Sequence, residues 1–256
     1  MITAGIDIGV KTIKVVVLSD GKILAKSLVL TGWEQREAGE KALDAALADA
    51  HLARGDIANI VATGAGRQAF PLAKQNVTEI TADARAVAFW HPKARTLIDV
   101  GAEEARAIKC TAEGRVADFV VNEKCAAGAG VFIETMARAL ELNLDEMGVL
   151  SLRATTVVPL NAQCTVFAES EVISLIHAKT PKPDIVRAVH DAIASRIAAM
   201  ARRVGVEKEI ALIGGVAHNV GFLDALKRAL ETNVLVPADP EFVGALGAAL
   251  IARDLK

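Results

Sequence analysis

The chain has 256 residues and a formal net charge of −2, and 52% of its residues are hydrophobic. This supplies enough apolar material for one large domain or two compact ones and argues against extended disorder. The near-neutral charge, without a long basic run, argues against a nucleic-acid partner, and no apolar run is long enough to cross a bilayer. Three cysteines do not suggest a disulfide framework, and the N-terminus opens on a strand pattern rather than a signal peptide. We therefore expect a soluble cytoplasmic protein with no membrane partner.

The first half of the chain is predicted to contain a run of strands followed by helices and short strands. Asp20-Gly21 is a typical hairpin turn between two β-branched runs, and Pro92 marks the end of a helix. In chain order we expect strands at 2–9, 12–19 and 22–30, a helix at 33–52, a strand at 56–64, a short helix around Gln68–Lys74, a short strand near Val77–Ile80 and a helix over Ala82–His91.

The second half repeats this plan from residue 95 onward. Three strands over 95–121 open it, and Gly205 caps a long helix. The further elements are predicted to be helices near 130–142, 166–178 and 184–204, a strand at 209–215, a helix at 219–230, a strand at 233–237 and a final helix at 241–253. The sequence thus predicts an α/β protein made from a duplicated βββαβα unit. We expect domains at 1–94 and 95–256, the last helix being able to pack back onto the first domain.

Each half opens with a hydrophobic strand that ends in Asp-x-Gly. In "GIDIGVKTIK", Asp7 ends the strand, and the turn at Gly9 lets backbone N–H groups approach an anion. Lys11, Thr12 and Lys14 add positive charge and a hydroxyl nearby. Phosphates held by such a turn, with the carboxylate ordering Mg²⁺ and a water, are one interpretation. A plain hairpin with a solvated aspartate is the other, and for a single turn it is the better one.

The second turn makes the phosphate interpretation stronger. In "LIDVGAEEA", Asp99 and Gly101 repeat the first motif. Further on, "ALIGGVAHN" ends a buried strand in Gly214-Gly215, where a flat ring could pack against backbone without meeting side chains. A tight strand-to-helix turn would look the same. The pair of Asp-x-Gly turns is what favours a nucleotide site.

Two of the three cysteines stand ahead of predicted helices. They are Cys125 in "NEKCAAGAG" and Cys164 in "NAQCTVFAES", whereas Cys110 lies in a strand pattern that predicts core packing. Two thiolates do not complete a four-coordinate site, so spacing alone leaves open a pair of buried free thiols.

The order Asp-x-Gly, Asp-x-Gly, Gly-Gly resembles the phosphate-1, phosphate-2 and adenosine motifs of the actin/sugar-kinase ATPase superfamily. Within it, "NEKCAAGAG", "QCTVFAESEVIS", "GGVAHN" and "GALGAALIA" resemble the branch that contains activators of 2-hydroxyacyl-CoA dehydratases and ATPase subunits of benzoyl-CoA reductases. The resemblance covers essentially the whole chain. It implies two RNase H-like domains with a nucleotide cleft between them.

The resemblance also implies a use for the two cysteines. In that family two subunits each donate two cysteines to one 4Fe–4S cluster, and the matching positions here are Cys125 and Cys164. The implied ligands are ATP or ADP, Mg²⁺ and the shared cluster. The implied partners are a second copy or a related ATPase subunit, reduced ferredoxin or flavodoxin as electron donor, and a dehydratase or benzoyl-CoA reductase catalytic component.

The implied site roles fall on residues of the matching motifs. Asp7, Asp99 and Glu103 are the expected catalytic residues, and the expected nucleotide-binding residues are Gly9, Lys11, Thr12, Lys14, Gly101, Gly214, Gly215 and Asn219. Two motifs depart from the family pattern. Val10 and Lys11 replace the usual Ser/Thr, so that Thr12 is left to supply the hydroxyl. Glu103 stands where the family has a glutamine that orients the attacking water.

Two other functions remain compatible with the sequence. One is a small-molecule kinase in which Asp99 acts as the base, although the chain has no obvious substrate-binding insertion and the cysteines would have no role. The other is an actin-like assembly protein without enzymatic function. Iron content after anaerobic purification separates both from the electron-transfer protein.

Overall fold

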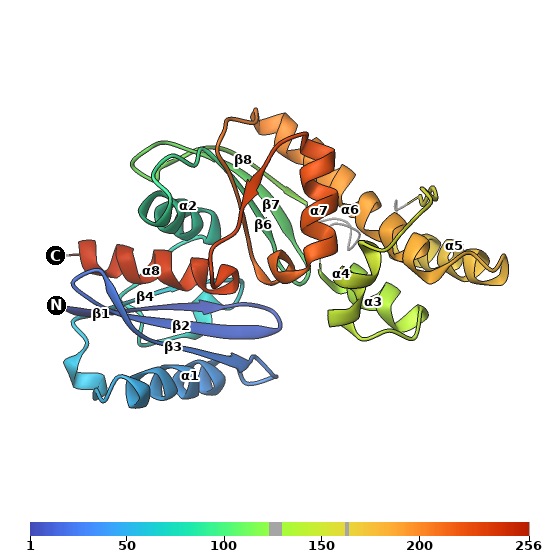
Figure 1. Cartoon of the computed structure of the whole chain (residues 1–256). Coiled ribbons are helices and arrows are strands. Elements are labelled where there is room, and N and C mark those ends of the chain that lie inside the picture. The colour runs from blue at the N-terminus through green and yellow to red at the C-terminus, as the bar shows by residue number, and fades with distance from the viewer. Residues whose placement is uncertain (123–129, 162–163, 256) are drawn as a thin grey trace. The chain divides into compact units, whose positions relative to one another are not determined.

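The structure, a computed structural model, describes residues 1–122, 130–161 and 164–255 (Figure 1). The chain forms two compact units. Unit 1 contains residues Met1–Ala94, Cys110–Ala117 and Glu241–Lys256, and unit 2 contains Arg95–Lys109 and Asp118–Pro240. No helix of the described ranges is long and apolar enough to cross a membrane.

Unit 1 is built on a five-stranded sheet with the order β3-β2-β1-β4-β5. The strands are β1 (Ile2–Ile8), β2 (Thr12–Ser19), β3 (Lys22–Leu30), β4 (Asn59–Thr63) and β5 (Gln75–Asn76). β1, β2 and β3 pair antiparallel, whereas β4 runs parallel to both β1 and β5. The predicted hairpin turn is confirmed: Asp20 and Gly21 both have positive φ, 49° and 82°, as a two-residue hairpin of primed type requires.

Helices cover both faces of this sheet (Figure 1). α1 (Gln35–Asp49) buries Leu43 and Leu47 on one face against Ile6 and Ile8 of β1. α8 (Val243–Asp254) lies on the other face and contacts α2 (Glu79–Trp90). The contact with β1 depends on a glycine, because a Cβ at Gly5 would lie 2.1 Å from the backbone oxygen of Ala245.

Two local predictions in this unit are wrong. The strand expected near Val77–Ile80 is absent, since β5 ends at Asn76 and α2 begins at Glu79. Thr78 caps that helix, its hydroxyl accepting the Thr81 N–H at 3.3 Å, so a helix start replaces the expected strand. The helix expected around Gln68–Lys74 is only a single 3₁₀ turn, Arg67–Ala69.

A second sheet repeats the first, and most of it lies in unit 2. Its strands are β6 (Thr96–Val100), β7 (Ala105–Cys110), β8 (Val116–Asn122), β9 (Ile210–Ile213) and β10 (Val234–Leu235), in the order β10-β9-β6-β7-β8. Read from β8, this is the order of the first sheet, with β6 antiparallel to β7 and parallel to β9. The predicted duplication is confirmed, and both sheets have the RNase H-like arrangement.

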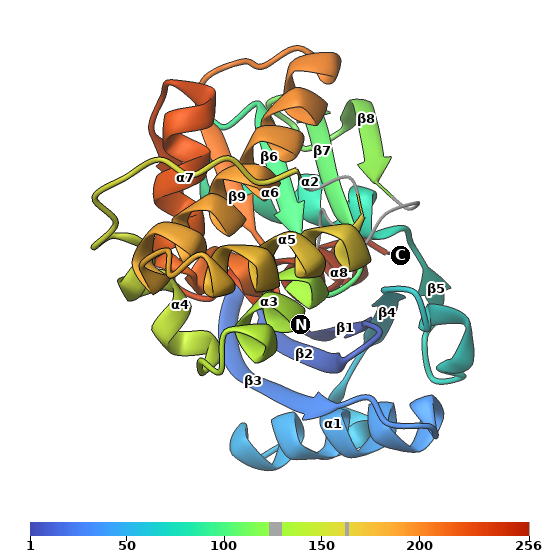
Figure 2. The same cartoon turned by 90° about the vertical axis from the view of Figure 1, so that its right-hand side faces the viewer.

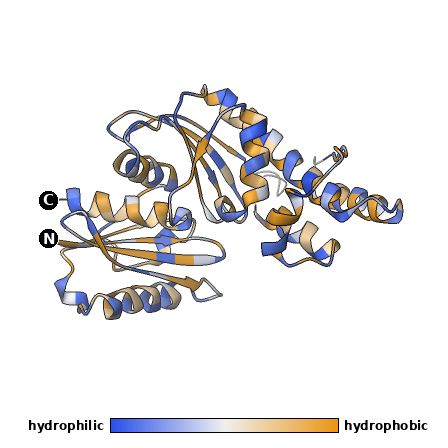
Figure 3. Cartoon of the chain, in the orientation of Figure 1, coloured by the Kyte–Doolittle hydropathy of each residue, from blue (hydrophilic) through white to orange (hydrophobic). Residues whose placement is uncertain are grey.

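The helices of unit 2 pack around one apolar core. They are α3 (Gly130–Ala139), α4 (Leu144–Ser151), α5 (Thr165–His177), α6 (Lys182–Val204) and α7 (Val220–Leu230), and α5 lies beside α3 (Figure 2). α4 was not predicted. It starts after Asn143, whose N–H donates to Glu146 at 2.8 Å. α6 ends at Val204 and is capped by Gly205, with φ 78°, as predicted. Figure 3 shows mostly hydrophobic residues along the central strands and a mixture of hydrophobic and hydrophilic residues along α7.

Candidate functional site

Asp7 lies near the end of β1, opposite Lys14 of β2. Lys14 Nζ is 3.2 Å from Asp7 Oδ2, and both side chains are largely buried. The other carboxylate oxygen, Asp7 Oδ1, is buried and has no hydrogen-bond partner in the part of the chain that the structure describes. A buried carboxylate oxygen without a partner costs free energy, so this atom fits a cation or a water bound to one.

The turn after Asp7 is held by its own backbone. Gly9 N–H donates to the Thr12 carbonyl at 3.1 Å, and the Lys11 carbonyl accepts the Thr31 N–H at 3.0 Å. The Thr31 hydroxyl donates to the Gly9 carbonyl at 2.8 Å. The structure therefore brings Asp7, Gly9, Thr12 and Lys14 together in one turn, whereas the Lys11 side chain is exposed.

Gly64 is a site residue that the sequence motifs did not reveal. It follows β4 directly and has φ +91°. A Cβ at this position would lie 2.4 Å from the Ile8 carbonyl oxygen and 2.5 Å from Asp7 Oδ1. Only glycine fits there, because the backbone conformation and the space both exclude a side chain.

Asp99 has the corresponding place in unit 2. It lies opposite Arg106 of β7, and Arg106 Nη1 donates to Asp99 Oδ2 at 2.6 Å. Arg106 also forms an ion pair with Glu104, and the Glu104 carbonyl accepts the Gly101 N–H at 2.9 Å. Glu103, the predicted water-positioning residue, is exposed. Arg106 was missed, although a basic residue seven positions after the aspartate occurs in both halves.

Gly214 repeats the geometry of Gly64. Its φ is +86°, and a Cβ would lie 2.4 Å from the Val100 carbonyl oxygen and 2.5 Å from Asp99 Oδ1. Gly215 is exposed, and a Cβ added there would meet nothing within 4 Å. The predicted Gly-Gly pair thus contains one glycine packed against the aspartate and one open to solvent, which leaves a backbone surface free of side chains.

The Asn219 side chain forms hydrogen bonds within unit 2. Its Oδ1 caps α7 by accepting the N–H groups of Gly221 and Phe222, each at 3.0 Å. Its Nδ2 lies 3.1 Å from Nε2 of His190, a fully buried residue of α6. The Asn219 amide must donate to this nitrogen, because its oxygen is taken by the helix cap.

The structure describes one of the two predicted metal ligands. Cys125 lies outside the described residues. Cys164 is half-buried and occupies the N-cap position of α5, where its carbonyl accepts the Ala168 N–H at 2.9 Å. A helix N-terminus favours a bound group of negative charge, so the position of Cys164 fits a ligand of an anionic metal cluster. Cys110 is buried in β7, as predicted, with its thiol 3.7 Å from the Ala94 carbonyl.

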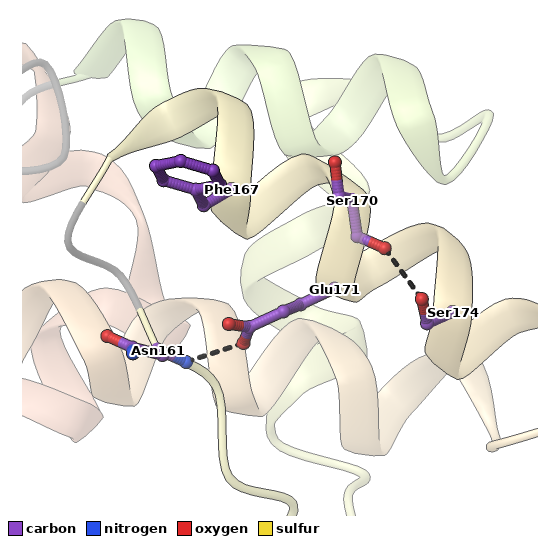
Figure 4. Close-up of a pocket in the computed structure, with 5 residues that line it drawn as sticks. All are labelled: Asn161, Phe167, Ser170, Glu171 and Ser174. Atoms are coloured by element: carbon purple, nitrogen blue, oxygen red, sulfur yellow. Dashed lines mark hydrogen bonds between the residues drawn. The ribbon is translucent and has the colours of Figure 1, made fainter.

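A pocket of about 370 Å³ lies beside the same helix (Figure 4). Glu171 points to the loop that precedes α5, where its Oε2 accepts the Asn161 N–H at 2.7 Å. Ser170 and Ser174 line the pocket but turn their hydroxyls to helix carbonyls, and Phe167 closes one side. The pocket contains none of the predicted nucleotide-binding residues.

The sequence profile of the BadF/BadG/BcrA/BcrD ATPase family matches residues 4–252. The chain belongs to this family. It is 43% identical to the activator of lactoyl-CoA dehydratase from Anaerotignum propionicum over 254 residues, 99% of this chain and 98% of the relative. A benzoyl-CoA reductase polypeptide from Thauera aromatica is 31% identical over 260 residues, 97% of this chain and 92% of that polypeptide.

Solved structures agree with this family assignment. The Acidaminococcus fermentans (R)-2-hydroxyglutaryl-CoA dehydratase component A matches with a TM-score of 0.96 and 37% identity over 99% of this chain and 98% of that one. The Clostridium difficile activator of 2-hydroxyisocaproyl-CoA dehydratase, solved with bound ADPNP, matches with a TM-score of 0.93 and 38% identity, covering 99% and 95%. A Streptomyces griseus glucokinase (TM-score 0.62, 15% identity, 100% of both chains) shares the fold alone, so this ATPase has the actin/sugar-kinase fold.

Proposed function

We propose that this ATPase is an electron activase. It holds a 4Fe–4S cluster jointly with a second subunit and passes a low-potential electron to an acyl-CoA dehydratase or reductase. The observation that carries the proposal is Cys164, a half-buried thiol at the N-terminus of α5 in a chain of the ATPase family. The names of the relatives, a dehydratase activator and a component of benzoyl-CoA reductase, support the same role.

The proposed nucleotide is ATP or ADP with Mg²⁺. Asp7 Oδ1 supports the cation site, since it is a buried oxygen of the kind that Mg²⁺ prefers and has no partner among the described residues. The ADPNP-bound relative supports the nucleotide. The proposed roles are cation binding for Asp7 and Asp99, water positioning for Glu103, phosphate binding for Gly9, Lys11, Thr12, Lys14 and Gly101, and adenosine binding for Gly214, Gly215 and Asn219.

The proposed cluster needs a second subunit. A 4Fe–4S cluster takes four thiolates, and Cys125 and Cys164 supply two, so two subunits about a two-fold axis supply the set. When bound, such a cluster supplies storage for one electron at low potential. Val166 and Phe167, beside Cys164, are 67% and 68% exposed, and this apolar surface supports a covering subunit. A homodimer and a heterodimer with a related ATPase subunit both meet this need.

Nucleotide binding can drive electron transfer only if it changes the conformation of the chain. A nucleotide shifts an equilibrium only if it binds the two conformations unequally, and a tenfold preference corresponds to about 1.4 kcal/mol. We propose reduced ferredoxin or flavodoxin as the electron donor and the cytoplasm as the location. The dehydratase or benzoyl-CoA reductase component is the proposed acceptor.

Anaerobic purification with iron and sulfide analysis and EPR tests this function. The wild-type protein is expected to be brown, with about four irons per dimer. Cys125→Ala and Cys164→Ala are expected to lose iron and the EPR signal and to keep ADP binding. The matched control is Cys110→Ala, which removes a buried thiol outside the cluster site and should leave the iron content unchanged. An EPR signal that survives in Cys164→Ala would show that Cys164 is not a cluster ligand. A colourless wild-type protein would refute the proposed activase function.

A further inference from the structure

Two buried oxygen atoms lie on neighbouring strands of unit 1. Asp7 Oδ1 belongs to β1 and Thr63 Oγ1 to β4, and neither has a hydrogen-bond partner within the described ranges. Thr63 is fully buried. A hydroxyl buried in this way normally has a partner, because leaving it without one costs the free energy of its desolvation.

The register of the sheet places these two side chains together. β1 and β4 are parallel, and Asp7 is paired with Thr63. Side chains of paired residues in a parallel sheet lie on the same face as neighbours. The face is the one that α8 covers, because Thr3 and Asn59, the first pair of the same series, donate to the carbonyls of Ala249 and Ala252, respectively.

Two glycines lie beside the Asp7 carboxylate. Gly64 has no side chain, and a Cβ there would lie 2.5 Å from Asp7 Oδ1. Gly244, in the first turn of α8, also lacks one, and a Cβ there would be 3.6 Å from Asp7 Oδ2. Lys14 already donates a hydrogen bond to Oδ2 at 3.2 Å. Oδ1 is therefore the carboxylate oxygen left to accept from a ligand.

We infer that Thr63 is a further residue of the magnesium site, where Asp7 Oδ1 and Thr63 Oγ1 both accept hydrogen bonds from cation-bound water. Mg²⁺ loses its waters reluctantly, so proteins often bind it through them. A threonine hydroxyl can accept from such a water, whereas an aliphatic side chain of the same shape cannot. This inference rests on the proposed function, because it deepens the cation site assigned to Asp7.

Thr63→Val tests the inference, since it keeps the shape of the side chain and removes the hydroxyl. ADP binding is measured by calorimetry with Mg²⁺ and again with EDTA. The variant is expected to bind ADP roughly tenfold more weakly with Mg²⁺ and with unchanged affinity in EDTA. Thr63→Ser, which restores the hydroxyl, is expected to recover the wild-type Mg²⁺ dependence. Iron content is expected to be the same in all of these proteins.

Thr3→Val is the matched control. Thr3 is also fully buried on the α8 face of β1, but its hydroxyl donates to the Ala249 carbonyl at 3.2 Å. Its replacement should lower the unfolding temperature and leave the Mg²⁺ dependence of ADP binding as in the wild type. If Thr63→Val behaves like Thr3→Val, the hydroxyl serves the fold alone and the inference is wrong. If wild-type ADP binding ignores Mg²⁺, the cation site itself is wrong, while the cluster proposal is judged separately by iron and EPR.

Discussion

Gly64 and Gly214 hold equivalent positions in the two halves of the chain. Each follows the strand that runs parallel to the aspartate-bearing strand, and each has a left-handed φ, +91° and +86°. A Cβ at either position would lie 2.5 Å from Oδ1 of the aspartate in the same half, Asp7 or Asp99. The duplicated unit therefore packs each carboxylate directly against a backbone that carries no side chain.

Gly64→Ala and Gly214→Ala are expected to destabilise the protein by about 2 kcal/mol or more. The left-handed backbone is strained for alanine, and the added methyl group overlaps a carbonyl and a carboxylate oxygen. Thermal unfolding measures the effect. Gly215→Ala is the control: its Cβ meets nothing within 4 Å, so the change should stay within about 0.5 kcal/mol. Equal unfolding temperatures for all three variants would contradict this account.

The burial of His190 predicts a pH dependence of stability. Burial lowers the pKa of His190 from 6.5 to about 4, with Asp191 opposing the shift and Arg228 adding to it. Between these values the unfolded state binds more protons than the folded state, so the free energy of unfolding rises with pH. As the pH falls from 6.5 to 4, this group alone removes up to about 3 kcal/mol.

His190→Gln is expected to flatten that part of the stability curve, because glutamine does not titrate while its amide oxygen can still accept from Asn219. Urea unfolding at a series of pH values between 4 and 7 measures it. His51→Gln, at an exposed position, is the control for losing an imidazole. A His190→Gln curve that parallels the wild type would show that His190 does not carry this dependence.

Arg106 is expected to contribute more to the stability of the fold than its ion-pair partner Glu104. Arg106→Ala removes the guanidinium beside buried Asp99 and should cost about 3 kcal/mol, because a buried carboxylate loses a charged partner. Glu104→Gln should cost under about 1 kcal/mol, because the Glu104 side chain is 42% exposed. Chemical unfolding of the two variants compares them. Similar losses would mean that Asp99 does not depend on Arg106.

Glu103→Ala tests the proposed water-positioning role. The residue is exposed, so its removal should change stability by less than about 0.5 kcal/mol. ATP hydrolysis is expected to fall about a hundredfold while ADP affinity stays the same, since a group that orients the attacking water acts on the rate. Glu113→Ala, at an exposed turn position, is the control for losing a surface carboxylate. Unchanged hydrolysis in Glu103→Ala would exclude the role.

Local pattern was sufficient for many elements of this fold. The β-branched runs and the Asp20-Gly21 turn predicted the first three strands, and the two Asp-x-Gly motifs revealed the duplication that both sheets confirm. Local sequence signals failed where a short segment carried signals for both a strand and a helix start. The β-branched residues at 77–80 favour a strand, but the capping hydroxyl of Thr78 starts a helix there instead.

The surroundings of Asp7 were decided by tertiary structure. Thr63, Gly64 and Gly244 come from distant parts of the sequence and meet Asp7 only because β4 pairs with β1 and α8 packs on the same face. His190 likewise meets Asn219 through the packing of α6 on α7. The sequence by itself determined which segments become strands and helices, since that choice depends on neighbours along the chain. Side-chain partners over long separations depend on how those segments pack, and only the folded chain shows them.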